Sequence, residues 1–113
     1  MALYYDLPVF HDVYQMILLL FQYTKNFPRE FKFTLGQDIK RDGLTLVRSI
    51  YRANKAQEKE RYLEEFLDDF ELLKFEVRLA AELRLFTIKQ HAQLTTYFSQ
   101  IGKQIIGWRN ASR

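Results

Sequence analysis

Four basic residues recur at helical spacing in the second quarter of the chain, and together they could bind phosphate groups. Arg41, Arg48, Arg52 and Lys55 follow one another at +7, +4 and +3. Each helical residue advances by roughly 100°, so all four fall within roughly 60° of arc. Guanidinium groups pair bidentately with phosphates, and like charges on one stripe repel one another unless an anion meets them. The spacing therefore indicates a track for a phosphate backbone, which would give affinity without sequence preference.

The same stripe can also be interpreted as an ordinary solvated helix face. Acidic residues on the next predicted helix could neutralise part of it: Glu64, Glu65, Asp68, Asp69 and Glu71. A second basic pair, Lys74 and Arg78, lies at i and i+4 between Glu71 and Glu82, a spacing typical of surface salt bridges. The net charge of +3 over 113 residues favours anionic partners without identifying them.

Residues suited to catalysis are few. The chain contains no Cys, which excludes thiol catalysis, Cys-ligated zinc and disulfides. The two histidines, His11 and His91, complete neither a Glu-x-x-His nor a His-x-x-x-His motif, and the chain has no Gly-rich phosphate loop and no Gly-x-Ser-x-Gly elbow. We therefore expect a protein that is not an enzyme, with no catalytic residues, no metal site and no cofactor.

The elements that position the basic residues are predicted to be helices. Apolar residues recur at helical spacing over about 8–25, 34–54, 57–85 and 88–108, and no stretch shows a β pattern. Pro8 suits a first helical turn, and Pro28 ends the first helix. Short connections make neighbouring helices antiparallel. The sequence thus predicts one all-α domain over 1–113, an up-down-up-down antiparallel four-helix bundle.

Local sequence signals mark two helix starts. Thr34 with Gln37 and Thr87 with Gln90 have the Thr-x-x-Gln pattern of a capping box. The last predicted helix carries an apolar seam of period 3.5 with a small residue, Gly102, expected where a neighbouring backbone approaches closely. The seam residues are His91, Leu94, Phe98, Ile101, Ile105 and Trp108.

The third predicted helix has two apolar stripes, which is more than one bundle seam requires. One stripe is expected to fill the core, and it consists of Leu63, Phe66, Phe70, Leu73, Val77 and Ala80. The other is a candidate oligomer interface, formed by Leu72, Phe75, Leu79, Leu83 and Phe86. Monomers seldom expose large apolar patches, so we expect self-association. The alternative is a helix that lies centrally in its own bundle.

Membrane insertion and export are not expected. The apolar run 16–21 is too short to span a bilayer, and acidic Asp6 and Asp12 precede it where a signal peptide would carry positive charge. A cytoplasmic protein without membrane contact is the expectation.

Four segments of the chain carry a family resemblance: Asn-Phe-Pro-Arg-Glu-Phe-Lys-Phe-Thr-Leu-Gly at 26–36, Ile-Tyr-Arg-Ala-Asn at 50–54, Leu-Lys-Phe-Glu-Val-Arg-Leu at 73–79, and Ile-Gly-Lys-Gln-Ile-Ile-Gly-Trp at 101–108. Together they resemble the Avd family, the accessory variability determinants of diversity-generating retroelements. A sister family, the bundle proteins encoded in intervening sequences of 23S rRNA genes, shares the Phe-Pro element. Its usual Asn-Ile-Ala-Glu-Gly run is replaced here by Tyr-Arg-Ala-Asn-Lys at 51–55, which favours Avd.

The resemblance implies a function that the residue pattern alone does not define. Members of the Avd family form homopentameric rings of four-helix protomers. They bind RNA and DNA and associate with the element's reverse transcriptase, which needs them for mutagenic copying of a template repeat. Basic residues of the third helix contribute to that contact in the family, and they match Lys74 and Arg78 here.

We therefore expect a non-catalytic accessory protein that binds nucleic acid and reverse transcriptase through Arg41, Arg48, Arg52, Lys55, Lys74 and Arg78. The alternative is an oligomeric protein-interaction scaffold of the rRNA intervening-sequence type, without a role at nucleic acid.

Overall fold

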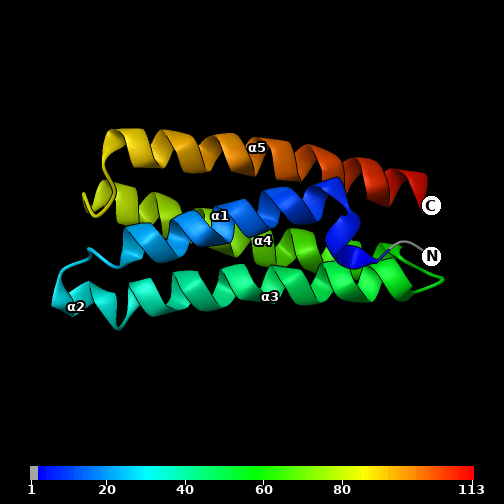
Figure 1. The fold of residues 1–113 in the computed structure, drawn as a ribbon, viewed down its shortest axis with the longest axis horizontal. Helices are drawn as coiled ribbons and strands as arrows, with labels where there is room; N and C mark the ends of the chain where they lie inside the picture. Colours follow the sequence, from blue (N-terminus) through cyan, green and yellow to red (C-terminus); the bar gives the residue numbers. More distant parts are fainter. Residues whose placement is uncertain (1–2) are drawn as a thin grey trace.

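The computed structural model describes residues 3–113, which form four long helices packed side by side (Figure 1). No strand occurs in this part of the chain, so the all-α prediction is confirmed. The bundle measures 44 × 22 × 22 Å. In chain order the elements are η1 (Tyr4–Asp6), α1 (Pro8–Thr24), α2 (Arg29–Lys32), α3 (Leu35–Lys55), α4 (Glu60–Glu82) and α5 (Ile88–Ala111).

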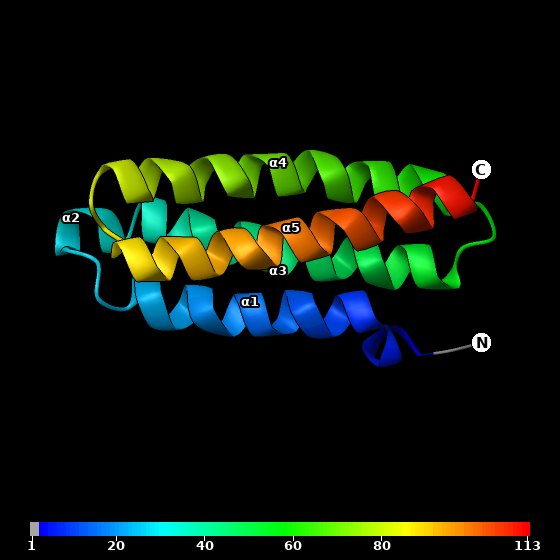
Figure 2. The same cartoon turned by 90° about the horizontal axis from the view of Figure 1, so that it is seen from above.

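The long helices run alternately up and down and contact one another in chain order. The α3–α4 pair has the most extensive contact, and α1 also packs on α3, α4 on α5 and α5 on α1. Figure 2 places α1 and α4 at opposite edges of the bundle, so these two helices form one diagonal. α3 therefore lies between α1 and α4, with its outer side facing away from the core.

The core consists of the apolar stripes that the sequence predicts. Phe66 and Phe70 of α4 are almost completely buried, and the Phe70 ring meets Phe98 of α5 edge-on with centroids 5.6 Å apart. The predicted seam of α5 is buried at Leu94, Ile101 and Ile105. Truncating one such Leu or Ile to Ala costs about 2–5 kcal/mol, so this core dominates the stability of the fold.

One of the two predicted capping boxes forms. At the start of α5, the Gln90 amide donates to Thr87 Oγ1 and the Thr87 amide donates to Gln90 Oε1, both at 3.0 Å. The box predicted at Thr34 is wrong. The short helix α2 precedes Thr34, and the Thr34 hydroxyl donates to the Glu30 carbonyl at 2.9 Å, so it does not cap α3. A nearby carbonyl has thus competed successfully for the hydroxyl.

Helix α4 is shorter than predicted at both ends. Before it, Lys59 Nζ donates to the carbonyls of Ala53, Asn54 and Ala56 at 2.8, 3.1 and 2.8 Å and so caps the end of α3. After it, Arg84 adopts a left-handed conformation with φ 63°, and the Leu85 amide bonds to Ala80 O at 2.9 Å. This is a Schellman-type ending without the usual Gly, and the missing Gly is why the sequence did not reveal it.

The close approach predicted at Gly102 is also wrong. A Cβ there would meet only the Phe70 ring, at an ordinary 3.7 Å. The tight glycines are on α3: a Cβ at Gly36 would lie 3.2 Å from the Phe31 carbonyl, and one at Gly43 would lie 3.2 Å from Leu20 Cδ1. These two glycines allow α2 and α1 to pack closely on α3. No helix in residues 3–113 is long and apolar enough to cross a membrane.

Candidate nucleic-acid and partner interfaces

The four basic residues of α3 share one outer face, as their spacing predicts. Arg48 and Arg52 are exposed and make no ion pair within residues 3–113. Arg41 pairs with Asp38 at 3.2 Å and with Asp42 at 3.4 Å. We call Arg41, Arg48, Arg52 and Lys55 the basic stripe; the Lys55 ammonium stands 4.5 Å from the centroid of the Tyr51 ring.

The acidic run on α4 does not neutralise the basic stripe by ion pairing. Glu64 pairs with Arg109 and Arg113, Glu65 with Arg61, and Glu71 with Lys74. Burial raises the pKa of Asp69, the neighbouring carboxylates add to this, and only the field of Arg48 acts against it. Arg48 therefore has an electrostatic neighbour but no salt bridge, and its guanidinium donors remain available to an anion.

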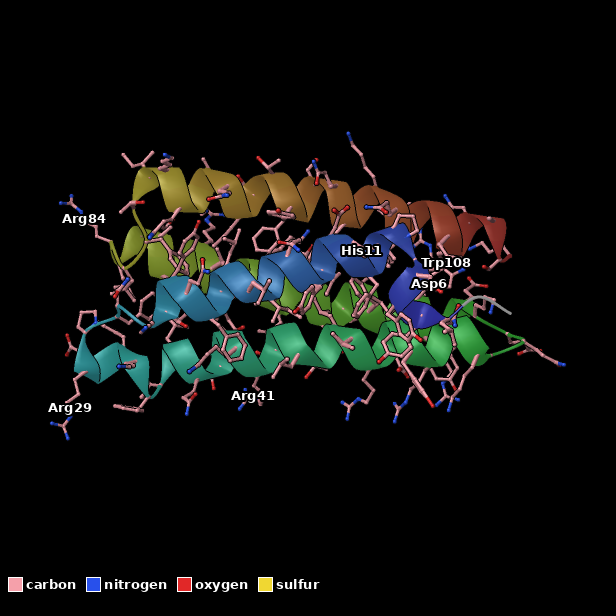
Figure 3. All side chains as sticks on the ribbon, in the orientation of Figure 1. Asp6, His11, Arg29, Arg41, Arg84 and Trp108 are labelled. Carbon is pink, nitrogen blue, oxygen red and sulfur yellow. The ribbon has the colours of Figure 1, made fainter. Side chains whose placement is uncertain are left out.

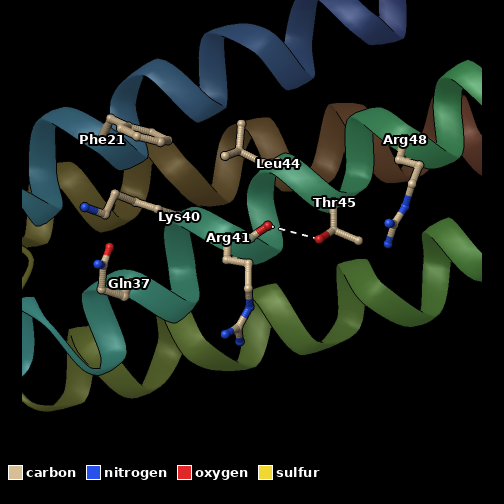
Figure 4. Close-up of a pocket in the computed structure, with 7 residues that line it drawn as sticks. All are labelled: Phe21, Gln37, Lys40, Arg41, Leu44, Thr45 and Arg48. Atoms are coloured by element: carbon tan, nitrogen blue, oxygen red, sulfur yellow. Dashed lines mark hydrogen bonds between the residues drawn. The ribbon is translucent and has the colours of Figure 1, made fainter.

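Beside the basic stripe, a cavity of about 440 Å3 opens between α1 and α3 (Figure 4). Phe21 and Leu44 form its apolar wall, and Lys40 Nζ lies 5.5 Å from the centroid of the Phe21 ring. Arg41 and Arg48 line its edge and extend away from Phe21 in the close-up. The cavity is thus lined by apolar side chains toward α1 and by two residues of the basic stripe on the outer side of α3.

The basic pair of α4 is arranged differently from the stripe. Lys74 Nζ lies 2.7 Å from Glu71 Oε1, and Arg78 Nε lies 3.3 Å from Glu82 Oε1. Both cations line a cleft of about 580 Å3 between α4 and α5, whose α5 wall includes His91, Thr95 and Phe98. The sequence placed His91 on the helix seam, and the structure shows it half-buried at the seam's edge, facing this cleft. The place of His91 near the start of the α5 seam was the sequence feature that could have indicated this half-buried position.

Four residues of the predicted oligomer interface form an exposed stripe on α4. Leu72, Phe75, Leu79 and Leu83 are 50, 61, 37 and 44% exposed, and we call them the α4 face. Phe86 does not belong to it, which corrects the prediction. Phe86 is 5% exposed, and its ring centroid lies 5.2 Å from that of Phe27. The chain turns at Arg84, so Phe86 no longer follows the phase of α4 and points into the core.

A second exposed apolar surface was not identified from the sequence. We call it the α1–α3 face; each residue is 41–50% exposed, and its members are Tyr14, Leu18 and Phe21 of α1 with Leu44 and Tyr51 of α3. The signal was available, because the run 16–21 is apolar on all sides of the helix and only part of it can face one core.

The buried carboxyl group of Glu76 meets the half-buried carboxyl group of Asp42 between α3 and α4. Glu76 is 8% exposed, and both its Oε1 and Asp42 Oδ2 are buried without a donor in residues 3–113. Burial raises the pKa of Glu76 to about 8, and a hydrogen bond to Asp42 together with the charges of Asp42 and Asp38 acts in the same direction, against Arg41. The Glu76 carboxyl thus keeps its proton at neutral pH and donates it to Asp42.

No three His, Asp or Glu side chains between residues 3 and 113 are placed to hold a metal ion together.

The fold is that of a four-helix bundle with a basic stripe and two exposed apolar faces. The family model described as bAvd-like matches residues 9–112. The chain belongs to this family, and the resemblance to Avd proteins read from its sequence is confirmed. None of the curated proteins compared with the chain matches it.

Proposed function

We propose that this protein is a non-catalytic, cytoplasmic accessory subunit of a diversity-generating retroelement. It binds nucleic acid and the element's reverse transcriptase and supports mutagenic copying of the template repeat. The observation that carries the proposal is the basic stripe of an Avd-like chain: Arg48 and Arg52 are exposed on one helix face and have no ion pair within residues 3–113. Unpaired guanidiniums at helical spacing suit a phosphate backbone.

The proposed mechanism is positioning of template and enzyme. Arg41, Arg48, Arg52 and Lys55 contact phosphates, which fixes the nucleic acid on the outside of α3 without reading its sequence. Lys74 and Arg78, at the cleft between α4 and α5, exchange their glutamate partners for phosphates or for acidic groups of the polymerase. The bond chemistry belongs to the reverse transcriptase.

The same proposal includes assembly of identical copies into a ring, a pentamer as in other Avd proteins. Its support is the α4 face, where Phe75 is 61% exposed, because soluble monomers seldom leave such stripes uncovered. A ring repeats the basic stripe in every copy. The modest charge of each chain is thereby summed into a stronger field and into several linked contacts with one nucleic acid.

A fluorescence-anisotropy titration of the purified protein tests nucleic-acid binding directly. The probes are a structured RNA and a duplex DNA of random sequence, each titrated at several salt concentrations. We expect binding whose logarithm falls steeply with the logarithm of salt, by up to about 0.9 for each phosphate contact on duplex DNA. Absent binding at low salt would contradict the nucleic-acid role.

The second candidate function, an oligomeric protein-interaction scaffold, is favoured by the two exposed apolar faces. A pull-down with a purified reverse transcriptase of a diversity-generating retroelement separates the two candidates. Co-elution with the polymerase together with salt-dependent nucleic-acid binding supports the retroelement role. An oligomer that binds neither supports the scaffold.

A further inference from the structure

The two exposed apolar surfaces of the protomer lie on the two sides of α3. On α4, Leu72 and Leu79 stand one turn before and after Glu76, which contacts Asp42 of α3, so the α4 face borders the α3 side of its helix. On the other side, Phe21 and Leu44 of the α1–α3 face line one cavity between α1 and α3. The basic stripe of α3 lies between the two faces.

The two faces differ in shape in a way that suits them to each other. The α4 face is a ridge on a single helix, and its most exposed side chain is Phe75, at 61%. The α1–α3 face is built from two helices and contains a hollow of about 440 Å3 beside Phe21 and Leu44 (Figure 4). Helices pack by placing the ridge of one into the groove between others. The ridge of the α4 face and the hollow of the α1–α3 face are therefore complementary in shape.

The charges left without partners are also opposite on the two faces. Beside the α1–α3 face, Lys40 makes no ion pair within residues 3–113. Beside the α4 face, Lys74 and Arg78 are held by their glutamates, and Asp68, one turn before Leu72, is exposed without an ion pair in the same range. One face therefore has a positive border and the other a negative border, an arrangement that favours contact between unlike faces.

We infer that the α4 face of one copy packs on the α1–α3 face of the next copy, in a head-to-tail contact. This inference rests on the proposed assembly and names the surface that the α4 face meets. One such contact, repeated, covers both apolar surfaces of every copy. Because both faces adjoin α3 instead of lying at opposite edges of the bundle, each copy turns relative to the last and the series curves, as the proposed ring requires.

Two blocked variants and their mixture test the inference. The first carries Leu72→Asp and Phe75→Asp on the α4 face, and the second carries Phe21→Asp and Leu44→Asp on the α1–α3 face. All four side chains are 43–61% exposed, so the charge is added outside the core. The control is Ile106→Asp, which is equally exposed at 43% but lies on α5. Circular dichroism establishes folding, and light scattering coupled to size exclusion gives the mass.

A head-to-tail contact gives a distinct result in each sample. The wild type and the control form the same oligomer, and each blocked variant alone is a folded monomer, because every contact needs one face of each kind. An equimolar mixture forms a heterodimer and nothing larger, since one intact pair of faces remains.

Other outcomes overturn the inference. If the variant blocked on the α1–α3 face keeps the wild-type mass, this face takes no part in assembly and the inference is wrong. A dimeric mass would then mean that the α4 face pairs with itself, which excludes a ring, and a larger mass would mean that the α4 face meets a different surface of the next copy. A folded wild type that remains monomeric at high concentration overturns both this contact and the proposed ring. Nucleic-acid binding is measured separately, and all these variants keep Arg41, Arg48 and Arg52.

Discussion

Helices α3 and α4 form the most extensive helix pair of the bundle, yet their outer cations are in different states. Arg48 and Arg52 of α3 have no ion pair within residues 3–113, whereas Lys74 and Arg78 of α4 are each paired with a glutamate of their own helix. The sequence indicated this difference, because Lys74 and Arg78 lie at salt-bridge spacing from Glu71 and Glu82, and the predicted salt bridges are confirmed. The comparison shows that the availability of a cation depends on its neighbours more than on its charge.

Between the same two helices, the charged groups that meet are acidic instead of basic. There, the half-buried carboxyl group of Asp42 and the buried one of Glu76 face each other, and the raised pKa of Glu76 keeps one proton on the pair, which Glu76 donates to Asp42. The α3–α4 pair thus presents exposed cations outside and a neutralised acid pair inside. Each of the following variants changes one part of this contrast.

The largest expected effect comes from Glu76→Gln. Folded Glu76 holds its proton up to about pH 8, while the unfolded carboxyl releases it near its ordinary pKa of 4.5. The wild-type free energy of unfolding therefore falls as pH rises between these values, by up to about 1.4 kcal/mol per pH unit. The glutamine donates to Asp42 at every pH, so the variant should be more stable than the wild type at pH 8 and similar to it below pH 4.5.

Urea unfolding at fixed protein concentration between pH 4 and pH 9 measures this difference. Glu71→Gln is the matched control, since the Glu71 side chain is 75% exposed on the same helix. Parallel stability curves for the wild type and E76Q would show that the acid pair does not hold a proton across this range.

The second prediction compares the outer cations directly. Replacing Arg48 and Arg52 by Gln should lower the slope of log affinity against log salt by up to about 1.8 on duplex DNA, because two phosphate contacts are lost. Replacing Lys74 and Arg78 by Gln should lower it less, because these cations must first leave Glu71 and Glu82. Anisotropy titrations across a salt series provide both slopes.

The control for this comparison removes the same charge elsewhere. Arg29 and Arg84 extend from one end of the bundle, away from Arg41 in Figure 3, and their double Gln variant loses the same two charges. It should retain most of the wild-type slope. An equal loss in all three double variants would mean that net charge, and not the basic stripe, governs binding.

A third, smaller effect is expected at the end of α3. Lys59→Met removes the ammonium that bonds three carbonyls, Ala53 O, Asn54 O and Ala56 O, and keeps the apolar stem. Losing charge-assisted bonds to a helix C-terminus should cost about 1–2 kcal/mol of unfolding free energy. Thermal and urea unfolding measure the cost, and Lys103→Met, at an exposed site on α5, is the control. Equal stability of the two variants would show that water caps these carbonyls as well as Lys59 does.

The sequence predicted those features of the fold that depend on periodicity. The core stripe of α4, the seam of α5 and the common face of the basic stripe all follow from residues spaced three and four apart. Features set by contacts between distant residues were missed. Nothing in the spacing brings Glu76 against Asp42, or places Phe21 beside Leu44 to make the second apolar face.

Some helix ends were also missed, because a residue other than the usual Gly or Pro ends the helix. Lys59 ends α3 from beyond the helix, and Arg84 ends α4 at a position where Gly would be expected. The predicted helix was therefore three residues longer than α4 at each end. Phe86 was predicted to belong to the exposed stripe, although it lies in the core. The sequence predicted the cations of the candidate site and the salt bridges of Lys74 and Arg78. It did not predict that Arg41 pairs with Asp38 and Asp42 of its own helix instead of with the acidic run of α4.

The smallest expected effect tests the ending of α4 at Arg84. A left-handed conformation costs a residue with Cβ about 1–2 kcal/mol, and glycine avoids this cost but adds about 0.4–1 kcal/mol of unfolded-state entropy. Arg84→Gly should therefore raise the free energy of unfolding by about 0.5–1 kcal/mol. Arg84→Ala removes the same side chain but keeps Cβ, so it should bring no such gain. If urea unfolding shows equal stability for the two variants, the backbone at Arg84 is not left-handed in solution, and α4 continues toward residue 85 as its sequence pattern suggests.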